Sequence, residues 1–159
     1  MSTIILLGQT PQESIRLETR RKNAIENAQE GTLTVGQIAE AAKLEKKFLG
    51  NRKRTEPLPH FNCHGLSFAC RRTRIWRTPE IAKILKDDGY TPIAEKDVLP
   101  GDLVIYFYNG DAEHSGVIVA VGEFGLTVCS KWGMLQEFVH PLRNCPYDFT
   151  NLEYYRITA

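Results

Sequence analysis

Cys63 is the residue whose setting in the sequence best suits covalent chemistry. Asn62 is a favoured N-cap residue, so the run Asn62-Cys63-His64-Gly65 predicts a helix with the cysteine in its first turn. Unpaired backbone N–H groups and the positive end of the helix dipole favour the thiolate there. The same N–H groups can donate to an oxyanion during acyl transfer. We therefore predict Cys63 as a nucleophile, with a buried structural cysteine as the alternative.

The residues around Cys63 are predicted to form an oxyanion site and a substrate cleft. Gly65 is small enough to leave room for a substrate backbone beside the sulfur. His64 is adjacent to Cys63, and because neighbouring side chains on a helix do not face each other, it is not expected to act as the base. Trp132, which is followed by glycine, is expected at the cleft wall. The predicted set is Asn62, His64, Gly65 and Trp132.

His114 is the predicted base for the Cys63 thiol. A nucleophile of this kind needs a base on a rigid neighbouring element. His114 opens the apolar run 114–119 directly after the polar turn 109–111, so we expect it at the solvent-facing edge of a core strand. The alternatives are a surface histidine at a strand end and, for the base itself, His60.

The third member of the catalytic group is predicted on a following strand. A triad needs a polar group that orients the imidazole. After His114 the chain turns at glycines and returns, which brings residues 130–133 opposite the histidine. If the strand register shifts by one residue, the residues that share a sheet face with His114 change to the other set. The candidates are Ser130 first, then Lys131, then His140.

Capping signals predict helices in the first half of the chain. Thr10-Pro11-Gln12-Glu13 and Thr34-Val35-Gly36-Gln37 are capping boxes, and the second opens an amphipathic run. A polar connector broken by prolines follows near residue 57. The predicted helices are 10–31, 34–50, one that begins at 62 or 63, and 78–89.

The second half of the chain is typical of strands. It is rich in β-branched and aromatic residues, in short runs separated by Gly, Asn and Asp. The connections are too short for crossovers, so an antiparallel sheet is expected. Helices followed by a meander of strands predict an α+β fold with N-terminal helices packed on the sheet. The predicted strands are 103–108, 114–121, 126–132 and, more weakly, 136–140 and 154–157.

The 159 residues are predicted to form a single domain, since the length suits one hydrophobic core. Residues 1–59 would form a helical N-terminal segment and connector, and residues 60–159 the catalytic core.

Three motifs occur in a fixed order between Phe61 and about Trp132. They are Asn62-Cys63-His64-Gly65, Leu99-Pro100-Gly101-Asp102-Leu103-Val104 and His114-Ser115-Gly116-Val117-Ile118-Val119. In order and rough spacing they resemble the NlpC/P60 group of papain-like cysteine peptidases and its CHAP-type relatives. Those proteins have a cysteine in an Asp-Cys-Ser-Gly-like helix start, a Pro-Gly-Asp-Leu-Val step into the first core strand, and a His-x-Gly-Ile-like strand.

The resemblance implies a papain-like fold and amide-bond hydrolysis through a thioacyl intermediate, with Cys63 as nucleophile and His114 as base. Asn62 stands where the family has an acidic residue, and His64 where it has a small one. The substrate is therefore left as a peptide or a peptidoglycan stem peptide. One version is a peptidoglycan amidase or endopeptidase delivered without a Sec signal, and the other is a cytosolic peptidase, deamidase or acyltransferase.

Two binding functions and a metal site are the alternatives to an enzyme. A catalytically inactive papain-like domain would only bind a partner. The segment 33–54 resembles the start of a helix-turn-helix and carries cations for phosphate contacts, although Lys43 holds the position where glycine is usual. The cysteines and His64 lack the paired spacing of a zinc site, so no metal or other cofactor is predicted.

Composition and charge exclude several classes of protein. The net charge of +1 gives no global field that would favour nucleic acid or a membrane surface, so neither is an expected partner. The apolar runs are too short to span a bilayer. Residues 1–8 have no positive region and no cleavage site, so a cytoplasmic location is the default expectation, with a dedicated export system as the alternative. The sequence indicates no oligomeric state.

Overall fold

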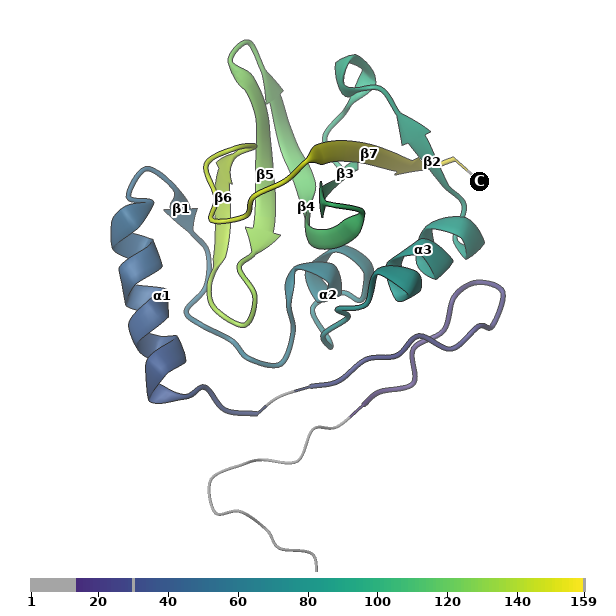
Figure 1. The fold of residues 1–159 in the computed structure, drawn as a ribbon. Helices are drawn as coiled ribbons and strands as arrows, with labels where there is room; N and C mark the ends of the chain where they lie inside the picture. The colour runs from purple at the N-terminus through teal and green to yellow at the C-terminus, as the bar shows by residue number, and fades with distance from the viewer. Residues whose placement is uncertain (1–13, 30, 159) are drawn as a thin grey trace, which may run out of the picture.

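A single antiparallel sheet dominates the structure, a computed structural model that describes residues 14–29 and 31–158 (Figure 1). Its strand order is β1-β6-β5-β4-β3-β7-β2, and every neighbouring pair is antiparallel. The predicted antiparallel pairing is therefore confirmed. The strands are β1 (Arg52–Lys53), β2 (Tyr90–Ile93), β3 (Leu103–Tyr108), β4 (Asp111–Gly122), β5 (Gly125–Lys131), β6 (Glu137–Pro141) and β7 (Asn151–Ile157).

Three short α-helices accompany the sheet in the described part of the chain. The Thr34 side chain accepts from the Gln37 backbone N–H in the predicted capping box of α1, and Asn62 caps α2 as predicted. None of the helices in the described ranges is long and apolar enough to cross a membrane. Figure 1 shows α2 and α3 below the central strands and α1 beside β1 and β6. The helices are α1 (Val35–Lys47), α2 (Cys63–Phe68) and α3 (Thr78–Asp87), with a 3₁₀ turn η1 (Glu95–Asp97) before β3.

The two faces of the sheet separate the residues that were expected to work together. Successive residues of a strand point to opposite faces. In the β3–β4 pair, Ile105 lies opposite Ser115, and Tyr106 lies opposite His114. Ile105 packs with Ile81 of α3, whereas Tyr106 belongs to the core cluster on the other face. Ser115 therefore faces the helices, and His114 faces the opposite core.

The loop between β6 and β7 covers the face opposite the helices. Leu142, Cys145 and Phe149 of this loop pack against the cluster that contains Tyr106. The Tyr106 hydroxyl also donates to the Leu142 carbonyl at 2.6 Å. This loop brings an aromatic side chain onto His114, as described below.

The predicted fold class is wrong. Over the described residues the chain is mostly a seven-stranded antiparallel sheet with three short helices, and not a papain-like NlpC/P60-type fold with N-terminal helices packed on a sheet. Of the predicted helix 10–31, residues 14–29 are not helical, and residues 10–13 lie outside the described part. Before residue 60, α1 is the only helix among the described residues.

Long-range contacts explain why residues 14–29 are extended. Ala28 pairs with Arg74 as an isolated antiparallel bridge, so its backbone groups are satisfied without a helix. Thr19 and Asn23 both donate to the Asp87 carboxylate at the end of α3. Tertiary hydrogen bonds thus override the local capping signal.

The five predicted strands form, as β3 to β7, with ends shifted by a few residues. The strands β1 and β2 were not predicted, because β1 is two charged residues long and β2 contains Pro92. The strand β1 also follows α1 where a recognition helix would have to begin, so residues 48–62 do not complete a helix-turn-helix.

Gly65 provides a test of how tightly α2 is packed. A Cβ added there would lie 1.8 Å from the Thr73 carbonyl oxygen, so Gly65 is needed for close backbone approach rather than for substrate room. We expect Gly65→Ala to lower the free energy of unfolding by about 1–3 kcal/mol or more in urea denaturation. Gly36→Ala in α1 is the matched control, since the nearest atom to its added Cβ is 3.9 Å away. The control should be neutral or slightly stabilising, and equal losses in both variants would contradict this account.

Candidate functional site

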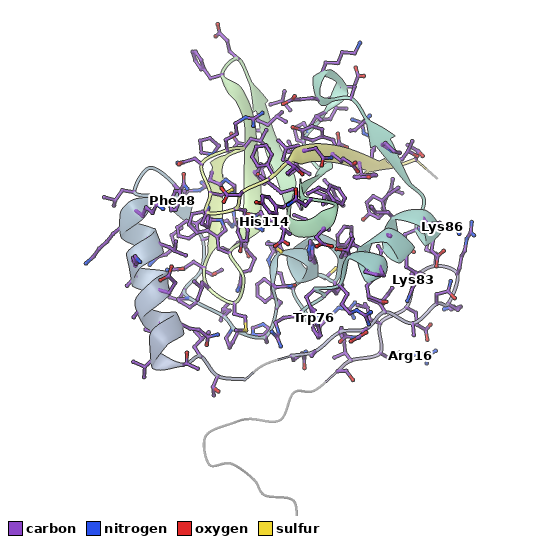
Figure 2. The ribbon with its side chains drawn as sticks, viewed as in Figure 1. Arg16, Phe48, Trp76, Lys83, Lys86 and His114 are labelled. Carbon is purple, nitrogen blue, oxygen red and sulfur yellow. The ribbon has the colours of Figure 1, made fainter. Side chains whose placement is uncertain are left out.

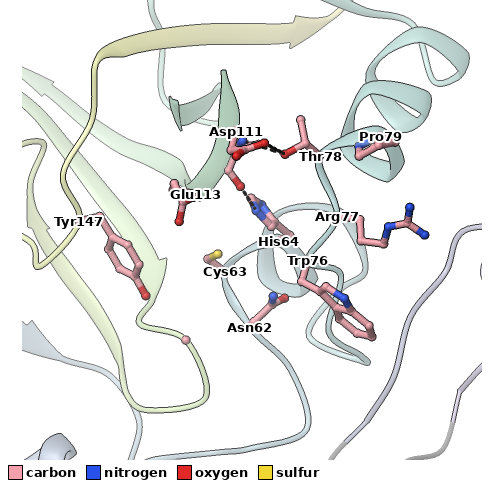
Figure 3. Close-up of a pocket in the computed structure, with 12 residues that line it drawn as sticks. Asn62, Cys63, His64, Trp76, Arg77, Thr78, Pro79, Asp111, Glu113 and Tyr147 are labelled. Atoms are coloured by element: carbon pink, nitrogen blue, oxygen red, sulfur yellow. Dashed lines mark hydrogen bonds between the residues drawn. The ribbon is translucent and has the colours of Figure 1, made fainter. Parts of the chain in front are cut away.

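A pocket of about 560 Å³ lies at the start of α2, and Cys63 forms part of its wall. In Figure 3, Cys63, Glu113 and Tyr147 lie around the same space, and they come from α2, β4 and the β6–β7 loop. The pocket thus brings a thiol, a carboxylate and a phenol together. The lining residues are Asn62, Cys63, His64, Trp76, Arg77, Thr78, Pro79, Asp111, Ala112, Glu113, Gly133 and Tyr147.

Asn62 fixes the start of α2 through its whole side-chain amide. Its Oδ1 accepts from the backbone N–H of Gly65 at 2.9 Å and from that of Ile75 at 3.1 Å. Its Nδ2 donates to the Ile75 carbonyl at 2.7 Å. Asn62 therefore positions Cys63, and its amide is already occupied by these bonds.

His64 ties α2 to β4. Its Nε2 lies 2.9 Å from the Ala112 carbonyl, which can only accept, so Nε2 carries the proton. Its Nδ1 then accepts from the Ser115 hydroxyl at 2.8 Å, and Ser115 accepts from Ser67 at 2.9 Å. Burial lowers the pKa of His64 to about 4, so the ring stays neutral.

The Cys63 thiol is almost fully buried, with 4% of its surface exposed. Burial raises its pKa to about 11. The backbone N–H groups of Ser115 and His64 and the positive charge of Lys131 act in the opposite direction and favour the thiolate. The resting sulfur is therefore a thiol, and it sits among groups that would stabilise the anion.

His114 lies in the interior of the molecule with both ring nitrogens unsatisfied (Figure 2). Neither nitrogen has a hydrogen-bond partner in the described part of the chain. The ring of Tyr147 stacks on it, with centroids 3.7 Å apart and planes 7° apart. Burial lowers the pKa of His114 well below its usual value, and the nearby His140 and His64 lower it further.

The Cys63 sulfur lies beside the backbone of β4 next to His114, but no hydrogen bond joins the side chains of Cys63 and His114. The N–H of Ser115, the residue after His114, acts on the Cys63 sulfur. The His114 side chain points to the other face of the sheet. Tyr147 connects the two, because its ring covers His114 and also lines the pocket with Cys63.

Ser130 shares a sheet face with His114 and hydrogen-bonds a different histidine. It pairs with Gly116, two residues along β4 from His114. Its hydroxyl lies 2.6 Å from His140 Nε2. His140 Nδ1 must donate to the Pro141 carbonyl at 2.8 Å, so Ser130 is the donor to Nε2. Ser130 and His140 thus satisfy each other near His114.

Trp132 does not line the pocket. It is 1% exposed and packs against Phe48, Phe138 and His140, so it belongs to the core where α1 meets β6. Its neighbour Gly133 takes the expected place in the pocket wall.

Comparison with protein families, with curated proteins and with solved structures finds no match. Within residues 14–29 and 31–158, no group of three or more His, Cys, Asp or Glu side chains is arranged to hold a metal ion. The site geometry alone therefore supports a functional proposal.

Two important pocket residues were missed in the sequence. Tyr147 lies in an irregular loop, and only the tertiary fold brings it to His114. Glu113 enters the pocket because β4 contains a register shift opposite Tyr106 and Phe107. Neither position carries a local signal, since loop paths and bulges depend on the whole sheet.

The depressed pKa of His64 predicts acid sensitivity. Its folded pKa of about 4 lies below the ordinary 6.5, so the unfolded chain binds the proton more readily. Stability is present above pH 6.5 and is lost as the pH falls toward 4, by on the order of 3 kcal/mol. We expect His64→Gln, which can keep both hydrogen bonds, to flatten this part of a stability–pH curve measured by urea denaturation. An unchanged slope would contradict the assignment.

Proposed function

We propose that this protein is a cysteine-nucleophile hydrolase that cleaves an amide bond in a peptide or a peptidoglycan stem peptide. The observation that carries the proposal is the setting of Cys63. It is the first residue of α2, it lines a pocket, and backbone N–H groups act on its sulfur. A helix start and donated N–H groups favour the thiolate, and they act against the burial that raises the pKa of Cys63 to about 11.

His114 is the proposed base. Among the buried histidines of the described part, His64 and His140 have both ring nitrogens engaged in hydrogen bonds. His114 has neither nitrogen engaged, so it can accept a proton without breaking an existing bond. A buried polar group without a partner is costly, and such costs are retained at functional sites. The ring lies on the other face of the sheet from the Cys63 sulfur and is covered by Tyr147, which also lines the pocket. The role therefore requires Tyr147 and the ring to rearrange when substrate binds.

The start of α2 supplies donors for an oxyanion. The first N–H groups of a helix have no partner within it. The N–H of Gly65 donates to the Asn62 side chain, so it is not available to an oxyanion. The N–H groups of Cys63 and His64 remain beside the sulfur. Two such donors directed at the carbonyl oxygen are the usual means of stabilising a tetrahedral intermediate.

The proposed cycle uses these groups in order. His114 accepts the proton of Cys63, and the thiolate attacks the carbonyl carbon while the oxyanion takes the helix N–H bonds. The C–N bond then breaks, and the proton passes from His114 to the leaving amine. Water hydrolyses the thioacyl group by the reverse route and regenerates the thiol.

A domain that binds a partner in this pocket without cleaving it is the second candidate. It is favoured by the near-complete burial of Cys63 and by the lack of a bond between its sulfur and the His114 ring. Product analysis separates the two candidates.

The first test of the hydrolase is the loss of Cys63. Purified sacculi and a diverse peptide library are incubated with the wild-type chain, and new termini are identified by mass spectrometry. We expect Cys63→Ala to lower product formation at least about a thousandfold, because the nucleophile is lost. Cys70→Ala, which changes an exposed free cysteine, should retain full activity. Equal activity of Cys63→Ala and wild type would end the proposal. If the wild type forms no product from either substrate, the binding domain is favoured.

A second test uses stability and activity together. Replacing a buried, unpaired polar group by an apolar one removes its desolvation cost. We therefore expect His114→Leu to raise the free energy of unfolding by about 1–3 kcal/mol while abolishing activity. His140→Leu is the matched control and should destabilise, since it breaks bonds to Ser130 and Pro141. A destabilised His114→Leu that remains active would contradict the role given to His114.

A further inference from the structure

Two carboxylates of β4 line the pocket that contains Cys63. Asp111 and Glu113 both belong to its wall, and both are exposed to solvent. In Figure 3, the Glu113 carboxylate lies between Tyr147 and Cys63, whereas Asp111 lies beside Thr78. The wall that β4 forms is therefore acidic.

Neither carboxylate is neutralised by a cation in the described part of the chain. Glu113 forms no hydrogen bond or ion pair there. Asp111 accepts one long hydrogen bond of 3.4 Å from the Thr78 hydroxyl and forms no ion pair with a described residue. Exposed carboxylates are common on protein surfaces, but these two share a pocket with the proposed nucleophile.

Arg77 is the only lysine or arginine among the described residues that line the pocket, and its charge is used elsewhere. Its Nη1 donates to the Glu26 carboxylate at 2.8 Å. In Figure 3 the guanidinium points away from Cys63. Glu26, which is outside the pocket lining, therefore offsets the charge of Arg77, and Asp111 and Glu113 stay uncompensated.

The other ionisable groups of the pocket wall are neutral at neutral pH. Burial raises the pKa of Cys63 to about 11 and lowers that of His64 to about 4. Burial also raises the pKa of Tyr147 well above its usual value. Asp111 and Glu113 therefore give the pocket a negative charge, and a cleft of one sign concentrates ligands of the opposite sign.

Lys131 lies behind the pocket wall. The preceding residue, Ser130, shares the sheet face of His114, so Lys131 points to the other face and is not placed to orient the His114 ring. Its ammonium is completely buried and donates to the carbonyls of Leu58 at 2.7 Å and Gly133 at 3.1 Å. Burial also lowers its pKa to about 7, which weakens its charge at neutral pH. Lys131 does not line the pocket, so it does not meet a ligand there.

We propose that the substrate of this pocket carries a primary ammonium group, which Asp111 and Glu113 bind beside the scissile amide. This inference deepens the proposed function and rests on it, because it names the substrate class of the Cys63 pocket. Carboxylates bind ammonium groups through charge-assisted hydrogen bonds. Trp76, which is 45% exposed and also lines the pocket, offers apolar surface to the methylene stem of such a group. A lysine-like side chain and a free amino terminus both supply this chemistry.

The test measures binding without cleavage, in the Cys63→Ala protein. The ligands are acetylated tripeptide amides with lysine, norleucine or glutamate in the centre, and the norleucine tripeptide amide with a free amino terminus. Affinities are measured by NMR titration of the backbone amides of β4. We expect the lysine peptide or the free-terminus peptide to bind at least roughly fivefold more tightly than the acetylated norleucine peptide, and the glutamate peptide to bind most weakly. The peptide that shows the gain identifies the source of the ammonium group.

Matched variants assign the gain to the two carboxylates. Asp111→Asn combined with Glu113→Gln keeps the size of both side chains and should abolish the gain. Glu113→Lys should make the glutamate peptide the preferred ligand. Glu123→Gln, at the tip of the hairpin between β4 and β5, is the control and should retain the gain.

Three results would overturn the proposal: no gain from either ammonium group, no measurable binding of any peptide, or a gain that survives in the double variant. None of these readouts uses cleavage. An ammonium preference in a protein whose wild type cleaves nothing would instead contradict the hydrolase assignment, so the two failures are distinguishable.

Discussion

The hydrogen-bonded series Ser67–Ser115–His64–Ala112 holds the start of α2 against β4, and the setting of Cys63 depends on it. Burial keeps His64 neutral, so Ser67 donates to Ser115 and Ser115 donates to His64 Nδ1. Through it, a helix of six residues is fixed on a strand that lies far away in the sequence. The backbone N–H of Ser115 is thereby directed to the Cys63 sulfur, and the pocket opens at a defined place.

The same packing that positions the thiol also suppresses its ionisation. Burial is the largest influence on the pKa of Cys63, and the helix N–H groups and Lys131 oppose it. The chain also tolerates an unpaired imidazole at His114, stacked under Tyr147. Charges and polar groups that are costly in the resting fold are typical of sites that bind or transform a ligand. The cost at Lys131 and His114 is offset elsewhere by apolar clusters on both sheet faces.

Local signals in the sequence predicted the local elements well. The capping box at Thr34 and the cap at Asn62 define two helix starts, because each is completed by neighbours within three residues. Strands β3 to β5 follow from their apolar composition. The helix expected over residues 10–31 does not form in the described residues 14–29, where the backbone of Ala28 pairs with that of the distant Arg74. The papain-like assignment failed with it, since three short motifs do not determine the layers of a fold.

The candidate site was only partly predictable for the same physical reason. The position of Cys63 at a helix start is a local property, and it was predicted. The sheet faces of Ser130 and Lys131 depend on register, which the sequence left open. The roles of His64 and Tyr147 come from contacts with residues that are distant in the chain, and no nearby pattern indicates them.

The most direct test of the central claim is to trap the covalent intermediate. Wild-type protein is quenched in acid during turnover of sacculi or peptides, and all four cysteines are mapped by mass spectrometry. The account predicts a hydroxylamine-sensitive acyl group on the peptide that contains Cys63. An acyl group on Cys70, Cys129 or Cys145 instead, or turnover with no acyl-cysteine at all, would contradict it.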